Sequence, residues 1–268
     1  MTTLLLSRPR ALSHSLSLRV LPQSGFASRW QSSVPQDDGG THEAPSHWLD
    51  QRFPGLRQWL DRKNRTWWLK GIQARCREYP QLQGQESYVA LLVERAYTDL
   101  AAKHKHLSID SRSQTHLQVA CLVLATQKVM QPYLRDSREV ARILHAHMGD
   151  HTSPVLRFLL RSTLFLSRDP YALALRRLKA LQLDYGKAFQ SQLNLTSDRS
   201  AELQIDRCFY ADIFNAEDAS ELLSTCCCSQ DKVWFDTLDS RGVTFQQSSW
   251  IGHDASKCCR LQIRKAAS

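Results

Sequence analysis

The spacing of apolar residues changes along the chain, from a helical period in its first half to a strand-like alternation after residue 185. Residues 86–103 show the helical period, because their apolar positions recur three or four residues apart; these are Val89, Leu92, Val93, Ala96, Tyr97 and Leu100. A helix that packs one face on a core has this spacing. The pattern therefore predicts a helix from Glu86, followed by an exit and turn over 103–113.

Four more helices are predicted by their own start and stop signals. One covers 114–131 and ends at Pro132, and the next covers 138–148 and stops at Gly149-Asp150. Ser153-Pro154 and Asp169-Pro170 each place an N-cap residue before a proline in the first turn, which favours a helix start. The last of these helices is predicted to run to about residue 181.

Strands are predicted only in the C-terminal part. Residues 189–195, 203–210 and 259–264 alternate apolar and polar positions, and 242–251 is rich in β-forming residues. Between them, 217–227 and 231–238 have helical patterns. Helices first and strands later favour an α+β fold, in which an N-terminal helical bundle packs on a small C-terminal antiparallel β-sheet with one or two helices.

The first 36 residues have the composition of a removable targeting peptide. Asp37 is the first acidic residue, and four arginines, no lysine and many serines and leucines precede it. This composition is typical of a transit peptide, whereas its arginines interrupt every apolar run long enough for a secretory signal. We expect cleavage after Trp30 and delivery to the mitochondrial matrix, with the chloroplast, or a disordered native tail, as alternatives.

The rest of the chain divides into a short segment and a domain. Residues 37–84 form a linker and a helical segment rich in Trp and Arg, and 85–268 form the α+β domain, helical over 85–182 and sheet-containing over 183–268. Four of the nine net positive charges lie before residue 37, so the remainder carries +5. Its charges of both signs are interspersed, so we do not expect a nucleic acid partner. No window approaches the ~18 consecutive apolar residues of a membrane span, so we expect no membrane partner.

Four tryptophans lie close to basic residues in segment 48–80. The tryptophans are Trp48, Trp59, Trp67 and Trp68, and the basic residues include Arg62, Lys63, Arg65 and Lys70. Such a mixture can stack on single-stranded nucleic acid. More often, such a segment is a helix that packs its tryptophans on the protein body while its arginines stay in water. We interpret segment 48–80 in this second way.

Six of the eight cysteines fall in the C-terminal part: Cys208, Cys226, Cys227, Cys228, Cys258 and Cys259. An organelle matrix is reducing, so we do not expect a disulfide framework. Catalysis, metal binding or simple burial are the roles that remain.

An ordered set of motifs runs through residues 186–264. It consists of Cys208-Phe-Tyr210, Cys228-Ser-Gln-Asp231, Trp234, Leu238, Gly242-Val-Thr-Phe245, Gly252 and Cys259-Arg260. Together these resemble the L-2-amino-thiazoline-4-carboxylic acid hydrolase family, which shows Cys-x-Tyr on a strand, Cys-x-x-Asp on a helix, a Gly-Val-x-Phe strand and a closing cysteine. The segment that begins at His116 resembles the family's central helix, so the resemblance covers roughly residues 85–264. Two departures are Leu261 where the family has an aromatic residue and Ser248-Ser-Trp-Ile-Gly252 where it has Thr-Leu-Ala-x-Gly.

The resemblance implies a hydrolase that opens a 2-amino-thiazoline-4-carboxylate ring to carbamoyl-cysteine, acting on a cyclic amidine carbon–nitrogen bond. Its partner would be a small-molecule carboxylate, and no cofactor is implied. Such a reaction needs a nucleophile or activated water, a proton shuttle, and a donor for developing negative charge.

We expect Cys228 to be the nucleophile, because it precedes the helix predicted over 231–238 and a helix N-terminus lowers the pKa of a thiol. Asp231 on the same side of that helix would hold the amino group of the substrate or act as a base. His253 would supply acid–base function. The other candidates are Cys208 as an alternative thiol, and Arg260, Tyr210 and Cys259 as substrate-binding residues, with Arg260 pairing a carboxylate.

Each candidate also has a structural interpretation. An aspartate after three cysteines is typical of a helix N-cap, which applies to Asp231. Cys208 and Cys259, on predicted strands, have the pattern of small buried hydrophobic residues. His253 in a polar turn and Arg260 on a strand are equally typical of solvated side chains.

A zinc site is the competing hypothesis for the cysteines. Its ligands would be Cys208, one of Cys226 to Cys228, Asp231, and Cys258 or Cys259. Because the C-x-x-C pairing common in structural zinc sites is missing, we expect no bound metal. A non-catalytic relative that binds a small ligand or metal, and an RNA-binding accessory protein using segment 48–80, stay open as alternatives to the enzyme. A flat basic face around Trp59 to Lys70 would favour RNA.

Overall fold

The computed structural model describes residues 56–134, 136–151, 162, 167–228, 241–249, 251, 256 and 258–266. These residues belong to one compact unit, Ala44–Ser268. The predicted transit peptide and most of the linker lie outside the described residues. So do the helix start predicted at Ser153 and the helix predicted over 231–238.

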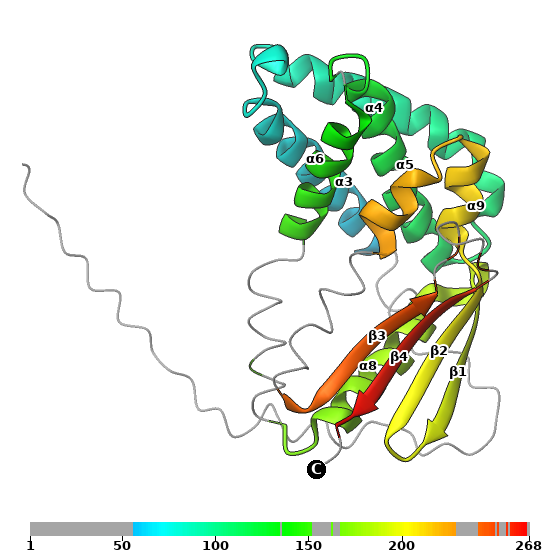
Figure 1. Ribbon diagram of the computed structural model, residues 1–268. Helices are drawn as coiled ribbons and strands as arrows, with labels where there is room; N and C mark the ends of the chain where they lie inside the picture. Colours follow the sequence, from blue (N-terminus) through cyan, green and yellow to red (C-terminus); the bar gives the residue numbers. More distant parts are fainter. Residues whose placement is uncertain are drawn as a thin grey trace, which may run out of the picture. The chain divides into compact units, whose positions relative to one another are not determined.

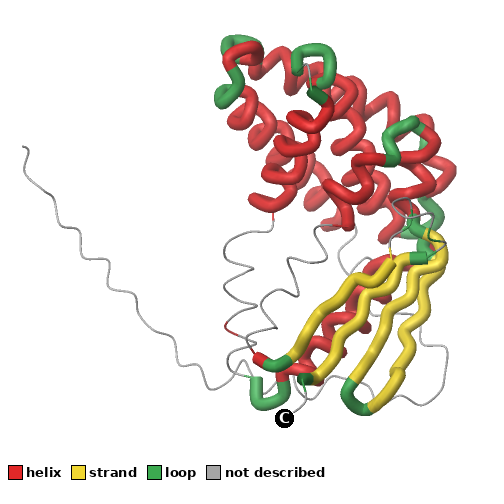
Figure 2. Tube along the Cα trace, viewed as in Figure 1, coloured by secondary structure: helices red, strands yellow, loops and turns green. Residues whose placement is uncertain are grey.

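The described residues form six α-helices and a four-stranded antiparallel sheet, which confirms the predicted α+β fold (Figures 1 and 2). The helices are α3 (Leu56–Cys76), α4 (Glu86–Lys103), α5 (Ser111–Met130), α6 (Ser137–His151), α8 (Pro170–Tyr185) and α9 (Phe209–Ala216). The strands are β1 (Gln190–Ser197), β2 (Ser200–Arg207), β3 (Val243–Ser249) and β4 (Cys259–Lys265). Short helical turns are η1 (Pro80–Leu82), η2 (Lys105–Leu107), η3 (Gly186–Ala188) and the π-helical η4 (Leu223–Cys228). A helix with the length and continuous apolar character of a bilayer span does not occur among the described residues.

Helix α5 is the centre of the helical layer, since every residue from Ala120 to Thr126 is buried. It begins three residues before the predicted start because Asp110 caps it. The Asp110 carboxylate accepts the Ser113 N–H at 2.6 Å, and the Ser113 hydroxyl accepts the Asp110 N–H at 2.9 Å. This reciprocal capping box satisfies backbone donors that the first turn of a helix leaves without partners.

The sheet has the strand order β1-β2-β4-β3. Leu203 of β2 lies opposite Leu261 of β4, and Phe245 of β3 lies opposite Ile263. Alternate side chains point to opposite faces of a strand, so one face carries the buried residues of β2 and β4. Helix α8 contacts all four strands and buries Ala174 and Leu178.

Three predicted boundaries are wrong in an informative way. The strand predicted to reach Tyr210 ends at Arg207, because Phe209, Ile213 and Phe214 have helical spacing and are buried as α9. Helix α6 continues through Gly149 to His151 rather than stopping at 148. Residues 217–220 form a turn before the π-helical η4, where a regular helix was predicted.

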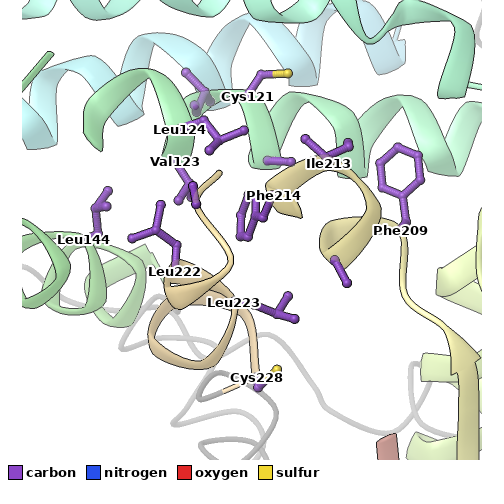
Figure 3. Close-up of a cluster of buried hydrophobic side chains, with 14 of the residues drawn as sticks. Cys121, Val123, Leu124, Leu144, Phe209, Ile213, Phe214, Leu222, Leu223 and Cys228 are labelled. Carbon is purple, nitrogen blue, oxygen red and sulfur yellow. The ribbon is translucent and has the colours of Figure 1, made fainter. Parts of the chain in front are cut away.

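The helical and sheet layers share one hydrophobic core. Figure 3 shows the part formed by Cys121, Val123 and Leu124 of α5, Leu144 of α6, Phe209, Ile213 and Phe214 of α9, and Leu222, Leu223 and Cys228 beside them. Cys228 therefore lies at the margin of this cluster.

Candidate functional site

A cavity of about 190 Å³ lies between the helical layer and the sheet. Its lining residues are His116, Met148, Leu181, Tyr185, Phe189, Ile205, Cys208, Tyr210, Cys228, Gln247 and Cys259. Typical pockets for drug-sized ligands measure ~300–1,000 Å³. This cavity therefore has room for a small molecule only.

Three thiols reach the cavity from three different elements. Cys259 is the first residue of β4 and is buried opposite Ile205 of β2. Cys228 is the last residue of η4 and is also buried. Cys208 is half-buried at the N-cap position of α9. The end of the π-helical turn and the end of β2 thus bring Cys228 and Cys208 to the start of β4.

The Cys259 thiol is the most acidic cysteine among those whose pKa shifts are resolved. A hydrogen bond from the Cys228 thiol lowers its pKa to about 7, against the opposing effect of burial, and the Ile251 N–H adds a second donor at 3.1 Å from Sγ. Burial has the opposite result elsewhere, raising the pKa of Cys76 to about 11 and that of Cys121 to about 12. Donors directed at a sulfur stabilise the thiolate, which is the nucleophilic form of cysteine.

His116 and Tyr210 form a hydrogen-bonded pair on the same cavity. His116 Nδ1 lies 2.8 Å from Tyr210 Oη, and Nε2 lies 2.9 Å from the backbone carbonyl oxygen of Asp184. A carbonyl oxygen only accepts, so Nε2 carries the proton and Nδ1 of the neutral ring accepts from the Tyr210 hydroxyl. Burial lowers the pKa of His116 below its ordinary 6.5, which keeps the ring neutral at pH 7. A proton taken up by Tyr210 Oη can therefore pass to His116.

Aromatic rings form one wall of the cavity. Tyr185 and Phe189 are stacked, with ring centroids 4.5 Å apart and an interplanar angle of 21°. The His116 ring meets Phe189 edge-on at 5.0 Å. This wall is aromatic and apolar, so it suits a flat ligand.

The structure brings together four of the residues singled out by the sequence motifs and separates a fifth. Cys208, Tyr210, Cys228 and Cys259 all line the cavity. Arg260 follows Cys259 on β4, so its side chain points to the opposite face of the sheet, where it is exposed and lies 3.6 Å from Glu202. Arg260 therefore does not share the cavity with the thiols.

Asp231 and His253 lie outside the described residues. Cys208 and Tyr210 lie on the N-cap and first turn of α9 rather than on the predicted strand. Cys228 ends a helical turn, so its placement in the cavity comes from η4 and from the core beneath it.

His116 is the residue that the sequence analysis did not single out as a site residue. It occupies the second turn of α5, and its partner Tyr210 is 94 residues away in the sequence. One histidine on a helix has no spacing motif, so only the segment that resembles the family's central helix pointed to it.

Within the part of the chain that the structure describes, no group of three His, Cys, Asp or Glu side chains has a geometry that could hold a metal ion. The zinc hypothesis also used Asp231, which lies outside that part.

Comparison of the sequence with protein-family models and with curated proteins finds no match. The resemblance to the L-2-amino-thiazoline-4-carboxylic acid hydrolase family therefore depends on the motif residues themselves.

Proposed function

We propose that this chain is a cysteine-dependent hydrolase that opens a small cyclic amidine, with Cys259 as its nucleophile. One observation carries the proposal: a thiol whose pKa is lowered to about 7 faces the same small cavity as a histidine–tyrosine pair that can accept a proton. Cysteine hydrolases need both an activated thiol and a base. The Ile251 N–H points at Cys259 Sγ from 3.1 Å and supports Cys259 as the thiolate of the hydrogen-bonded cysteine pair, with Cys228 as the donor.

The cavity supports an amidine as the reacting group. A protonated amidine is a planar cation: the Cys259 thiolate attracts its charge, and the aromatic Tyr185–Phe189 wall suits its planar shape. Lysine and arginine are not among the described residues that line the cavity, so nothing described there repels a cation. The family resemblance makes 2-amino-thiazoline-4-carboxylate the first compound to test.

In the first half of the proposed reaction, the Cys259 thiolate adds to the amidine carbon. A carbon–sulfur bond forms, and the π electrons of the C=N bond move to nitrogen, which neutralises the amidinium. Collapse of this adduct breaks the ring carbon–nitrogen bond as the lone pair of the exocyclic nitrogen re-forms a C=N bond, and the departing ring nitrogen takes the proton of the Cys228 thiol. The ring is then open and attached to Cys259.

In the second half, a water molecule displaces Cys259 from the amidine carbon. Tyr210 Oη accepts a proton from the attacking water while its own proton passes to His116 Nδ1. The water oxygen bonds to the same carbon, and Cys259 leaves as a thiolate. The proton on His116 returns through Tyr210 to Cys228, so one water is consumed and the protein is unchanged.

The test is turnover of 2-amino-thiazoline-4-carboxylate by the purified full-length chain under reducing conditions, followed by mass spectrometry of the ring-opened product. Cys259→Ser should reduce the rate by at least ~10³-fold, in the range seen when a nucleophile is removed. Cys258→Ser is the matched control, because this neighbouring thiol interacts with Arg260, which does not share the cavity. Full activity of Cys259→Ser would exclude the nucleophile assignment, and ligand binding without turnover would favour the non-catalytic alternative.

We further propose the mitochondrial matrix as the location, supported by the Arg- and Ser-rich, acid-free composition of residues 1–36. Import into isolated mitochondria, with N-terminal sequencing of the protected product, tests this. A mature N-terminus at Gln31 would match cleavage after Trp30, and an unprocessed, protease-accessible chain would contradict it.

A further inference from the structure

The net charge of helix α3 equals the net charge of all residues after position 36. It contains six basic residues, Arg57, Arg62, Lys63, Arg65, Lys70 and Arg75, and one acidic residue, Asp61. That balance of +5 equals the charge left when the four arginines before Asp37 are subtracted from +9. The other residues after position 36 therefore balance to zero, and the positive charge is concentrated rather than interspersed.

The basic and aromatic residues of α3 share one exposed face. At ~100° per residue, Trp59, Arg62, Lys63, Trp67 and Lys70 fall within about 140° of the helix circumference. Trp59 is 48% exposed and Trp67 is 42% exposed, while Arg62, Lys63 and Lys70 are exposed too. We call these five residues the α3 face.

The opposite side of α3 packs on the core through Trp68, Ile72 and Cys76. Trp68 Nε1 donates to Thr126 Oγ1 at 3.1 Å, which anchors the helix on α5. The expectation that the tryptophans pack on the body thus holds for Trp68, but Trp59 and Trp67 leave much of their rings in solvent.

Two contacts hold the exposed tryptophans in place. The Lys63 ammonium lies 5.6 Å from the centroid of the Trp59 ring, and Trp67 stacks on His147 with centroids 5.6 Å apart. The positive charge continues beside this face. Arg62, Arg65 and Lys105, with one acidic residue, Asp61, border a hollow of about 560 Å³ between α3, α4 and α5.

We propose that the α3 face binds single-stranded RNA. Unstacked RNA bases lie on aromatic side chains, and phosphates pair with lysine and arginine, which is the combination that α3 presents. Trp59 and Trp67 are separated by two helical turns, about 12 Å, with Lys63 between them. Two bases of one strand stack on the two rings, a phosphate between them meets Lys63, and the next phosphate beyond Trp67 meets Lys70.

The same residues fit a lipid surface less well. A helix that lies in a bilayer interface needs a broad apolar face, whereas Ile72 and Leu69 of α3 pack on the core and the α3 face has only two apolar side chains. Alternating aromatic and basic residues match the alternation of bases and phosphates instead. The site is separate from the thiol cavity, so this inference does not depend on the proposed hydrolase activity.

The test is fluorescence anisotropy of the full-length chain with a labelled 20-nucleotide oligouridylate at several salt concentrations. Trp59→Ala should weaken binding by about 5- to 150-fold, the range for loss of one base–aromatic stack. The double variant Lys63→Gln/Lys70→Gln should reduce the slope of log K against log salt by about 1.4, since each phosphate contact on a single strand contributes ~0.7. Arg176→Gln/Lys179→Gln on α8 is the charge-matched control, because both of its residues are exposed. It should leave the affinity and the slope as they are in the unaltered chain.

Thermal unfolding of each variant, followed by circular dichroism, shows whether the fold is kept. Trp59 is half exposed, so its variant should unfold within a few degrees of the unaltered chain. Absence of RNA binding, equal affinity of Trp59→Ala and the unaltered chain, or tighter binding to oligothymidylate than to oligouridylate would overturn the proposal. Binding to vesicles of phosphatidylglycerol without binding to RNA would overturn it in favour of a membrane surface.

Discussion

His116 Nδ1 and Tyr210 Oη lie 2.8 Å apart although 94 residues separate them in the sequence. The contact joins the central helix α5 to the first turn of α9, and the carbonyl oxygen of Asp184 fixes the proton on the other imidazole nitrogen. In carbonyl and amidine chemistry such a pair moves a proton without either group being charged at rest.

Tyr210→Phe should abolish the proton relay between Tyr210 and His116 without disturbing the fold. The ring stays in place, so the aromatic contacts with Phe189 and Phe214 remain. Loss of the hydroxyl should reduce the rate of amidine opening by about 10²- to 10⁴-fold, the usual contribution of a general acid or base. Tyr88→Phe, on the exposed surface of α4, is the control for a lost hydroxyl. A rate unchanged in Tyr210→Phe would remove this pair from the mechanism.

The acidity of Cys259 should depend on the Cys228 thiol. Alkylation of Cys259 by iodoacetamide, followed by peptide mass spectrometry, should rise with pH through about 7. Cys228→Ala removes the principal donor, so the midpoint should move up toward the ordinary thiol value of 9.0 or above. Cys228→Ser keeps a donor and should move it less. If the alanine and serine variants share the midpoint of the unaltered chain, Cys228 does not stabilise the thiolate.

Glu217 should make stability depend on pH in the acidic range. Burial opposes its ionisation, but hydrogen bonds from Lys103, Lys128 and His104 outweigh that effect and lower its pKa from 4.5 to about 2. Because the folded pKa is below the unfolded one, the stabilisation is present above about pH 4.5 and is lost as pH falls toward 2.

Glu217→Gln should therefore reduce the free energy of unfolding by about 2 kcal/mol at pH 7, measured by urea titration. The difference between this variant and the unaltered chain should shrink as the pH approaches 2. Glu78→Gln, which removes an exposed carboxylate paired with Arg75, should cost less than ~1 kcal/mol. A Glu217→Gln difference that stays constant from pH 7 to pH 2.5 would contradict the linkage.

Gly71→Ala should destabilise the packing of α3 on α6. A Cβ at this position would overlap His147 Cε1, and that ring is buried between Trp67 and Trp68. Overpacking of a rigid core typically costs 1–3 kcal/mol, and we expect about 3 kcal/mol or more here. Gly84→Ala is the comparison: it has open space but a φ of +79°, so it should cost about 1 kcal/mol from backbone strain alone. Equal free energies of unfolding for the two variants would show that His147 can move aside.

The order of secondary structure could be predicted because it depends on local periodicity. The helix from Glu86 and the N-cap at Asp169 lie where the pattern placed them, since the Asp169 carboxylate accepts the Ala172 N–H at 3.0 Å. Boundaries that depend on tertiary contacts could not be predicted. Residues 209 and 210 continue the alternation of the strand predicted over 203–210. They start α9 instead, because Ile213 and Phe214 are buried against α5.

The sequence by itself determined the α+β class, the concentration of cysteines in the C-terminal part and the identity of three cavity thiols. Tertiary structure alone decided that a hydrogen bond joins Cys228 and Cys259, that His116 lines the same cavity, and that Arg260 faces away from it. The reason is physical: periodicity records which face of one element is buried, whereas a pKa or a proton relay depends on donors that other elements bring within about 3 Å.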